Sequence, residues 1–189
     1  VNSIKTPQGA FRLKFPVEQH MGQLINEVRP KYELKWRDKH LRTLEMNYSK
    51  AKFFKDVYPG LKEVYMVDYA NVADLNIAIN EYIAGQFGIK PKFVKSSEFH
   101  LDTKREEKVI DLCVAVGGTR YISGNGARVY QDPEHFSARG VELTYLEYKP
   151  IEYPQLWKEF APCMSVLDYI FNCGYDWDYV LKEVEKLNQ

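Results

Sequence analysis

The feature of this sequence that most constrains its fold is a strand–helix–strand pattern between residues 91 and 126. Residues 91–96 have the composition of a short strand, and the spacing of Thr103 and Glu106 predicts a capping box that opens a helix. A second short strand follows, and it ends in a glycine-containing loop. Parallel strands joined by a helix have their carboxyl ends at one edge of a sheet. The pattern therefore places two pairs of residues together at that edge: Ser96-Ser97 and Ser123-Gly124.

The loop after the second strand has the sequence Ser123-Gly124-Asn125-Gly126. Glycine lets a backbone approach a ligand closely, and successive N–H groups in such a loop can bind an anion or a carbonyl oxygen. Ligands of α/β proteins bind at the carboxyl ends of strands, which is where this loop lies. Two interpretations stay open: a ligand-binding loop and a tight turn without a ligand.

The rest of the chain predicts one domain over all 189 residues. Its expected class is α/β, with a mostly parallel sheet flanked by helices and an N-terminal hairpin. Hydrophobic spacing, turn residues and caps predict the other elements. These are a hairpin over 2–17, helices over 36–48 and 71–87, a turn at Pro59-Gly60, a short helix from Asp132-Pro133, a strand over 141–145, and helices capped by Ser165 and Asp176.

Composition narrows the classes of function. Lysine plus arginine and aspartate plus glutamate both number 26, so the chain lacks the basic surplus of a general nucleic-acid binder. No apolar run is long enough to span a bilayer and no signal peptide is visible, which predicts a cytoplasmic protein. The three cysteines, Cys113, Cys163 and Cys173, predict buried reduced thiols. The first residue is Val1, so we expect the chain to begin inside a longer protein.

Three groups of polar residues could carry chemistry, and each also has a purely structural interpretation. Trp36, His40 and Asn47 share a stripe with Thr43 on one predicted helix, which marks either a binding surface or a half-buried edge. Glu98 and His100 could transfer protons or could be ordinary surface residues. Asp168 and Asn172 could bind a polar ligand or could tie their helix to a loop. No metal-ligand spacing occurs, so no metal is expected.

Several segments together resemble the WbqC-like protein family, which is named from bacterial O-antigen gene clusters. The similar stretches are IKTPQGAF, WRDKHLRTLEMNYSKAKFF, ADLNIAI, KFVKSSE, KREEKVIDLC, YISGNGARVY and FAPCMSVLDYIFNCG. They cover about residues 1–174 in the order of the family. Members of the family also have a preceding strand with an HQPxYxPW-like motif, which this chain lacks, so part of a site is expected outside it.

The resemblance implies a role in surface-polysaccharide synthesis, with N-acylation or aminoacylation of an amino sugar on a nucleotide carrier. ATP would be a cofactor if the acid is activated as an adenylate. We expect His40, His100 or Glu98 to accept the proton of the amine, and the remaining residues to bind substrate: Trp36, Asn47, Ser96, Ser97, Tyr121, Ser123, Gly124, Gly126, Asp168 and Asn172. The partners would be a nucleotide-linked sugar or an acyl donor, and a homo-oligomer is compatible with the sequence. The alternative is a non-catalytic nucleotide-sugar-binding or scaffolding protein.

Overall fold

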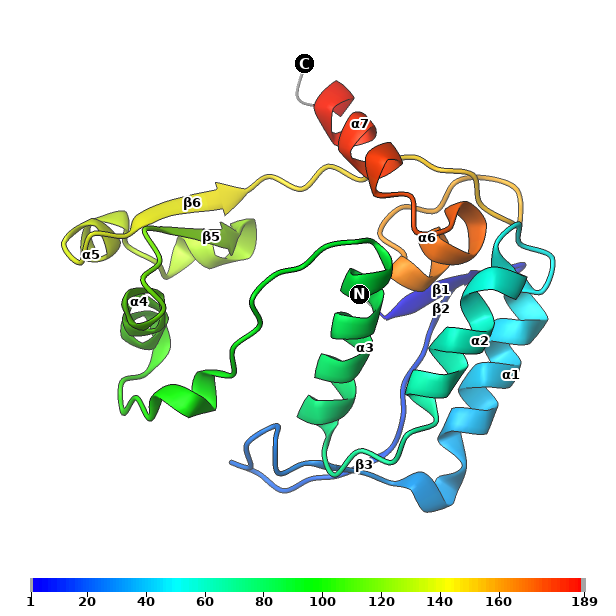
Figure 1. The fold of residues 1–189 in the computed structure, drawn as a ribbon, viewed down its shortest axis with the longest axis horizontal. Helices are drawn as coiled ribbons and strands as arrows, with labels where there is room; N and C mark the ends of the chain where they lie inside the picture. Colours follow the sequence, from blue (N-terminus) through cyan, green and yellow to red (C-terminus); the bar gives the residue numbers. More distant parts are fainter. Residues whose placement is uncertain (1, 188–189) are drawn as a thin grey trace. The chain divides into compact units, whose positions relative to one another are not determined.

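The computed structural model describes residues 2–187, which combine α-helices with short strands (Figure 1). Contacts divide the chain into two compact units. Unit 1 consists of Val1–Lys90 and Pro150–Gln189, and unit 2 consists of Pro91–Lys149. Each unit is described by itself below.

Unit 1 begins with the predicted hairpin. Strand β1 (Ser3–Thr6) pairs antiparallel with β2 (Gly9–Arg12), and the Thr6 hydroxyl donates a 2.8 Å hydrogen bond to the Gly9 carbonyl across the turn. The paired region is shorter than the predicted 2–17, and Pro16, which has no N–H to donate to a ladder, lies in the part that is not paired. A second short antiparallel pair joins β3 (Val17–Glu18) to β4 (Arg29–Pro30).

Three helices follow in unit 1, after the single turn η1 (Tyr32–Leu34). Helix α1 (Trp36–Tyr48) and helix α3 (Val72–Gln86) confirm the predictions, and the Asn71 side chain caps α3 by accepting from the Asp74 N–H. The predicted turn at Pro59-Gly60 is wrong, because helix α2 (Phe54–Tyr65) continues through both residues. A Cβ at Gly60 would collide with the Tyr82 hydroxyl of α3, so a larger residue there would require the Tyr82 side chain to move.

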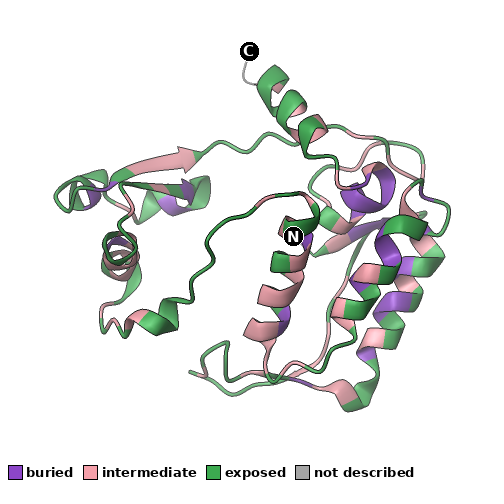
Figure 2. Cartoon of the chain, viewed as in Figure 1, coloured by how far each residue is buried: buried purple, intermediate pink, exposed green. Residues whose placement is uncertain are grey.

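The core of unit 1 combines residues from the N-terminal and C-terminal parts of the chain. Helix α6 (Val166–Cys173) is capped by the Ser165 side chain, as predicted, and the Ser165 N–H donates to the Ser3 carbonyl of β1 at 2.7 Å. Apolar residues of β1, α1, α2 and α6 pack into one cluster: Ile4, Leu41, Leu44, Tyr48, Ala51, Val57, Tyr58, Leu61, Tyr169, Ile170 and Phe171. The two C-terminal helices differ in burial. Figure 2 shows that α6 is largely buried, whereas α7 (Trp177–Leu187) is not.

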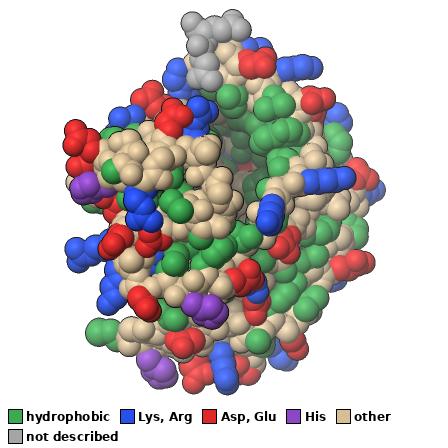
Figure 3. Space-filling view, turned by 60° about the vertical axis from the view of Figure 1, so that its left-hand side comes forward, with side chains coloured by type: hydrophobic (Ala, Val, Ile, Leu, Met, Phe, Trp, Pro, Cys, Tyr) green, Lys and Arg blue, Asp and Glu red, His purple; other side chains and the backbone are tan. Residues whose placement is uncertain are grey.

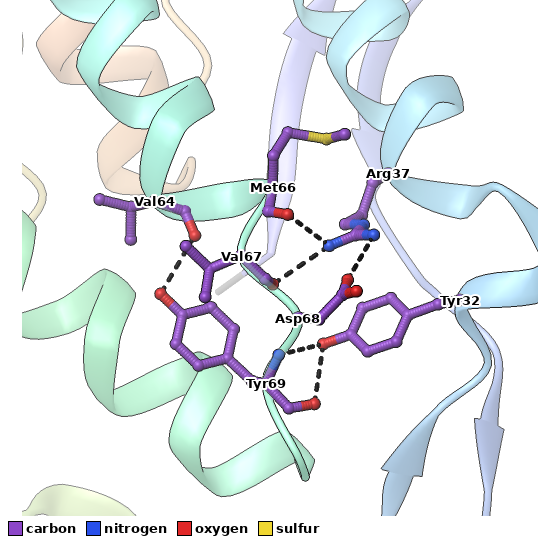
Figure 4. A network of polar contacts seen from close by, with 7 residues as sticks. All are labelled: Tyr32, Arg37, Val64, Met66, Val67, Asp68 and Tyr69. Atoms are coloured by element: carbon purple, nitrogen blue, oxygen red, sulfur yellow. Dashed lines mark hydrogen bonds and ion pairs between the residues drawn. The ribbon is translucent and has the colours of Figure 1, made fainter.

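The connection between α2 and α3 is held by a polar network (Figure 4). Arg37 of α1 donates hydrogen bonds to the carbonyls of Met66 and Val67 and forms an ion pair with Asp68 at 2.8 Å. Its guanidinium also lies 4.3 Å from the ring centre of Tyr32, whose hydroxyl is hydrogen-bonded to the backbone of residue 69. This network ties the loop between α2 and α3 to η1 and α1.

Unit 2 is built around a parallel pair of strands. Strand β5 (Arg120–Gly124) pairs with β6 (Glu142–Leu146), with Tyr121 opposite Leu143 and Gly124 opposite Leu146. The turn η3 (Asn125–Val129) and helix α5 (Pro133–Ser137) connect the two strands, and Asp132 caps α5 as predicted. Helix α4 (Arg105–Ala115) packs on this pair, and Ile110, Phe136 and Val141 form the small core.

Two expectations for this region are wrong, and one for the sheet of the whole chain is not confirmed. Residues 91–95 form no strand and are exposed, and the turn η2 (Ser96–Phe99) follows them, so the predicted shared edge of Ser96-Ser97 and Ser123-Gly124 is wrong. The Thr103 side chain does not cap α4; its hydroxyl instead donates to Asp111 at 2.8 Å. The expected mostly parallel sheet is not confirmed either, because the strands of residues 2–187 form three separate two-stranded sheets, of which one is parallel.

The cysteines also differ from the prediction. All three are free thiols, but Cys163 is exposed, while Cys113 and Cys173 are half-buried. The apolar neighbours of Cys163 in the sequence belong to an irregular segment before α6, and such a segment does not bury each of its residues in turn.

On the face drawn in Figure 3, side chains of both charge signs are interspersed with apolar ones. Among residues 2–187, none of the helices has the length and apolar character that crossing a bilayer requires.

Candidate functional site

A pocket of about 570 Å³ lies within unit 1, beside the stripe that the sequence singled out on α1. Its walls come from the segment after β2 and from helices α1, α2, α3 and the start of α6. Apolar side chains form most of the lining, with a few polar groups between them, which is the composition of a small-molecule site. The lining residues are Asn2, Leu13, Phe15, His40, Leu41, Leu44, Leu61, Tyr65, Leu75, Asn76, Ile79, Asn80, Ile83, Met164, Ser165, Val166 and Leu167.

His40 is the titratable residue of this lining that the sequence predicted as a catalytic base. It is buried, with 7% of its surface exposed, and both ring nitrogens are engaged. Nε2 lies 2.9 Å from the Lys14 carbonyl, which can only accept, so Nε2 carries the hydrogen. Nδ1 lies 2.5 Å from the Tyr65 hydroxyl and therefore accepts its hydrogen bond in the neutral imidazole. The Lys14 carbonyl thus fixes the tautomer of His40.

Burial keeps the side chains of His40 and Tyr65 uncharged. Desolvation lowers the pKa of His40 below its ordinary value, and the hydrogen bond to the Lys14 carbonyl opposes that shift in part. Burial likewise raises the pKa of Tyr65 well above its ordinary value. Both side chains are consequently neutral near pH 7. Because the Nδ1 lone pair accepts the hydrogen bond of the Tyr65 hydroxyl, the pair can take up one proton through that hydroxyl.

The sequence analysis did not predict the other polar residues of this pocket as site residues, among them Tyr65 and two asparagines of α3. Asn76 and Asn80 are four residues apart, so they lie one turn apart on the same face of the helix, beside the buried Leu75. The signal was present in the stretch ADLNIAINEY, where a polar stripe adjoins the predicted apolar one. Tyr65 gave no such signal, because its partnership with His40 joins two different helices.

The other predicted residues of α1 divide between two environments. Trp36 is buried, with its ring stacked on Phe15 at 4.4 Å and meeting the His40 ring edge-on at 5.4 Å. Asn47 lies two turns further along the helix, where its side chain donates to the Thr43 carbonyl at 2.8 Å. Trp36 and His40 therefore form one cluster, and Asn47 lies outside it.

Asp168 and Asn172 lie together on α6, but their hydrogen bonds are internal. The Asp168 carboxylate is fully buried and accepts from the hydroxyls of Tyr48 and Tyr153 and from the Gln155 amide. The Asn172 amide donates back to the Asp168 carbonyl at 2.7 Å. These contacts tie α6 to α1 and to the loop before it, which is the structural alternative that the sequence left open.

The remaining candidates belong to unit 2. Ser96, Ser97 and Glu98 are exposed residues of η2, and His100 is the exposed residue that ends this turn, with a left-handed φ of 47°. These four adjoin one another along the chain. Their exposure leaves them free to contact a ligand without placing them in a pocket.

The loop after β5 is also open. Tyr121 stacks on Phe136 at 5.7 Å in the small core, so one ring face is already used for packing. Ser123 is buried, whereas Gly124 and Gly126 are exposed, and a Cβ built on either glycine would meet no atom within 4 Å. Gly124 has φ −75° and ψ 150°, which any residue can adopt. The fold alone therefore does not require glycine at these two positions.

Metal binding has no geometric basis in the described part of the chain. No group of three or more histidine, cysteine, aspartate or glutamate side chains within residues 2–187 is arranged to hold a metal ion.

Comparison with known proteins shows the family to which the chain is related. The WbqC-like protein family matches residues 1–178. A curated protein of Mycobacterium tuberculosis (strain ATCC 25618 / H37Rv), named "Uncharacterized protein Rv1507c", is 32% identical over 177 residues, which are 92% of this chain and 76% of that protein. No solved structure matches. The family match covers nearly the whole chain, in agreement with the resemblance of its separate motifs, so the chain belongs to the WbqC-like protein family.

Proposed function

We propose that this protein N-acylates or aminoacylates the amino group of a nucleotide-linked amino sugar in bacterial surface-polysaccharide synthesis. The family supports the biosynthetic setting through the gene clusters from which it is named. The observation that carries the proposal is the hydrogen bond between His40 Nδ1 and the Tyr65 hydroxyl on the wall of an amphipathic pocket.

The reaction needs an amine without its extra proton, because only the neutral amine has the lone pair that attacks an acyl carbonyl. In the proposed mechanism the amine nitrogen forms a bond to the acyl carbon of an activated donor, and the leaving group of the donor departs. The proton lost by the amine passes to the Tyr65 oxygen while the Tyr65 proton passes to His40 Nδ1. The imidazolium that results donates both N–H groups, one to Tyr65 and the other to the Lys14 carbonyl.

The remaining polar residues of the pocket suit the binding of the sugar. Asn76 and Asn80 present amides that both donate and accept, as sugar hydroxyls do. The apolar side chains of α1, α2 and α3 would contact the sugar ring and the carbon chain of the acyl group. The low pKa of the buried imidazole lets it release the proton to solvent again after each turnover.

Mass spectrometry of an acyl-transfer reaction tests this proposal. The protein is incubated with a UDP-linked sugar that carries a free amine, together with an acyl-coenzyme A donor or with an amino acid and ATP. We expect an amide product. Tyr65→Phe and His40→Ala should each lower its rate by about a hundredfold or more, the usual contribution of acid–base catalysis. Tyr130→Phe, a change at an exposed tyrosine, is the matched control.

A second candidate is a non-catalytic nucleotide-sugar-binding or scaffolding protein. The observation in its favour is that both ring nitrogens of His40 are already hydrogen-bonded to protein groups. A binder predicts that UDP-linked sugars bind, that no amide forms with any donor, and that Tyr65→Phe changes affinity alone. A transferase predicts loss of rate with nearly unchanged affinity.

A further inference from the structure

A second hollow, of about 390 Å³, lies in unit 1 on the other side of His40. It shares His40 and Leu13 with the larger pocket, so the imidazole forms part of the wall of both. The segment from β2 to Pro16 provides one side and helix α1 provides the other. The lining residues are Phe11, Arg12, Leu13, Lys14, Pro16, Leu34, Trp36, Lys39, His40 and Thr43.

The charges of this hollow have one sign. Arg12, Lys14 and Lys39 contribute three cations to the lining, and no aspartate or glutamate belongs to it. None of the three has an ion-pair partner within residues 2–187. In a chain with a formal net charge of zero, three unpaired cations around one concave surface make a local site for an anion.

Uncharged residues also line the hollow. Trp36 has 3% of its surface exposed, and its indole N–H is buried without a hydrogen-bond acceptor among the described residues. That N–H is closed to solvent, so it offers no contact to a ligand in the hollow. Phe11 and Leu34, by contrast, are about half exposed, with 49% and 48% of their surfaces accessible. They provide an apolar rim beside the cations.

We infer that this hollow binds the nucleoside diphosphate part of the substrate. Arg12, Lys14 and Lys39 would bind the two phosphates, and Phe11 and Leu34 would contact the nucleoside. The inference rests on the proposed function, since it assigns the carrier to one side of His40 and leaves the amine and acyl group to the larger pocket. The stripe of Trp36, His40 and Thr43 on α1 then faces substrate along its length, with the His40–Tyr65 pair where the two hollows meet.

Calorimetric titration of the whole protein with UDP and with inorganic pyrophosphate, at low salt, tests the assignment. We expect both to bind, with UDP tighter because of the apolar rim, and we expect added salt to weaken both. Lys39→Met should weaken UDP binding at least about tenfold, since a charge-assisted hydrogen bond is lost. Lys55→Met, a change at an exposed lysine of α2 outside the lining, is the matched control and should leave the affinity unchanged.

Equal UDP affinity in Lys39→Met and Lys55→Met would overturn the site, and equal affinity for UDP and pyrophosphate would overturn the nucleoside part of the assignment. The acyl-transfer assay separates these failures from failure of the proposed function. If Lys39→Met loses UDP binding but the unmodified protein forms no amide, the diphosphate site stands and the transferase does not. If amide forms equally fast in Lys39→Met, the transferase stands and the diphosphate site does not.

Discussion

The hydroxyl of Tyr48 donates a 2.5 Å hydrogen bond to Oδ1 of Asp168, which lies 120 residues further along the chain. The same hydroxyl accepts from the Lys5 N–H at 2.9 Å, so one tyrosine links β1, α1 and α6. The Asp168 carboxylate raises the pKa of Tyr48 further, in addition to the larger effect of burial. The proton therefore stays on the phenol, and the network remains a set of donors around one carboxylate.

Replacement of Asp168 should destabilise the protein strongly. Asp168→Ala leaves the buried donors of Tyr48, Tyr153 and Gln155 without their acceptor, and the loss should be about 3–5 kcal/mol of the free energy of unfolding. Urea denaturation followed by circular dichroism measures it. Asp102→Ala, at an exposed loop position, is the control and should change stability by less than about 0.5 kcal/mol. Similar stabilities for the two variants would contradict the role given to the network.

The cysteines should react with iodoacetamide in a fixed order. Burial raises the pKa of the Cys173 thiol to about 11, with a smaller contribution from the Asp168 charge. At pH 8 only about one Cys173 in a thousand is then the reactive thiolate. Cys163 is exposed and should be alkylated first. Peptide mass spectrometry after timed labelling checks this order, and Cys163→Ser should remove the fast phase. Labelling of Cys173 at the rate of Cys163 would show that its surroundings are not those described.

The pKa of His135 should depend mainly on the carboxylate of Glu106. A 2.7 Å hydrogen bond from Nδ1 to Glu106 raises the pKa of this exposed histidine, and the Asp132 charge raises it further. The pKa of His135 is higher in the folded than in the unfolded chain, so protonated His135 stabilises the folded protein. This stabilisation is fully present below the ordinary pKa of 6.5 and is lost as the pH rises through the folded pKa. NMR titration of His135 should show the pKa falling in Glu106→Gln. In the control Glu107→Gln, at a neighbouring exposed residue, it should stay nearly unchanged.

Substitution by alanine should cost much more stability at Gly174 than at Gly124. Gly174 has φ +75°, and a Cβ there would lie 3.0 Å from Cδ1 of Phe53, so Gly174→Ala should cost about 1–3 kcal/mol through strain and contact. Gly124 has an ordinary conformation and open space, so Gly124→Ala should cost less than about 1 kcal/mol. Thermal unfolding measures both. If Gly124→Ala or Gly124→Val also abolishes UDP-sugar binding while the fold is retained, this loop contacts the ligand.

Much of the local structure could be predicted because it depends on neighbours in the sequence. The helix over 36–48 follows from apolar residues three and four apart, and the caps by Asn71, Asp132 and Ser165 follow from side chains that bond an N–H two or three residues away. The turn of the first hairpin follows from Thr6 and Gly9 in the same way. These interactions are complete within a few residues, so tertiary contacts had little to change.

Membership of the family, most of the helices and the stripe of Trp36 and His40 could thus be predicted from residue patterns alone. Packing of the folded chain settled that Pro59 lies inside a helix, where contact with α3 outweighs its local preference, and that residues 91–95 pair with no strand. It also decided that Tyr65 meets His40 and that three cations without partners surround one hollow. Each of these depends on residues far apart in the chain, whose contacts arise from packing and leave no periodic trace in the sequence.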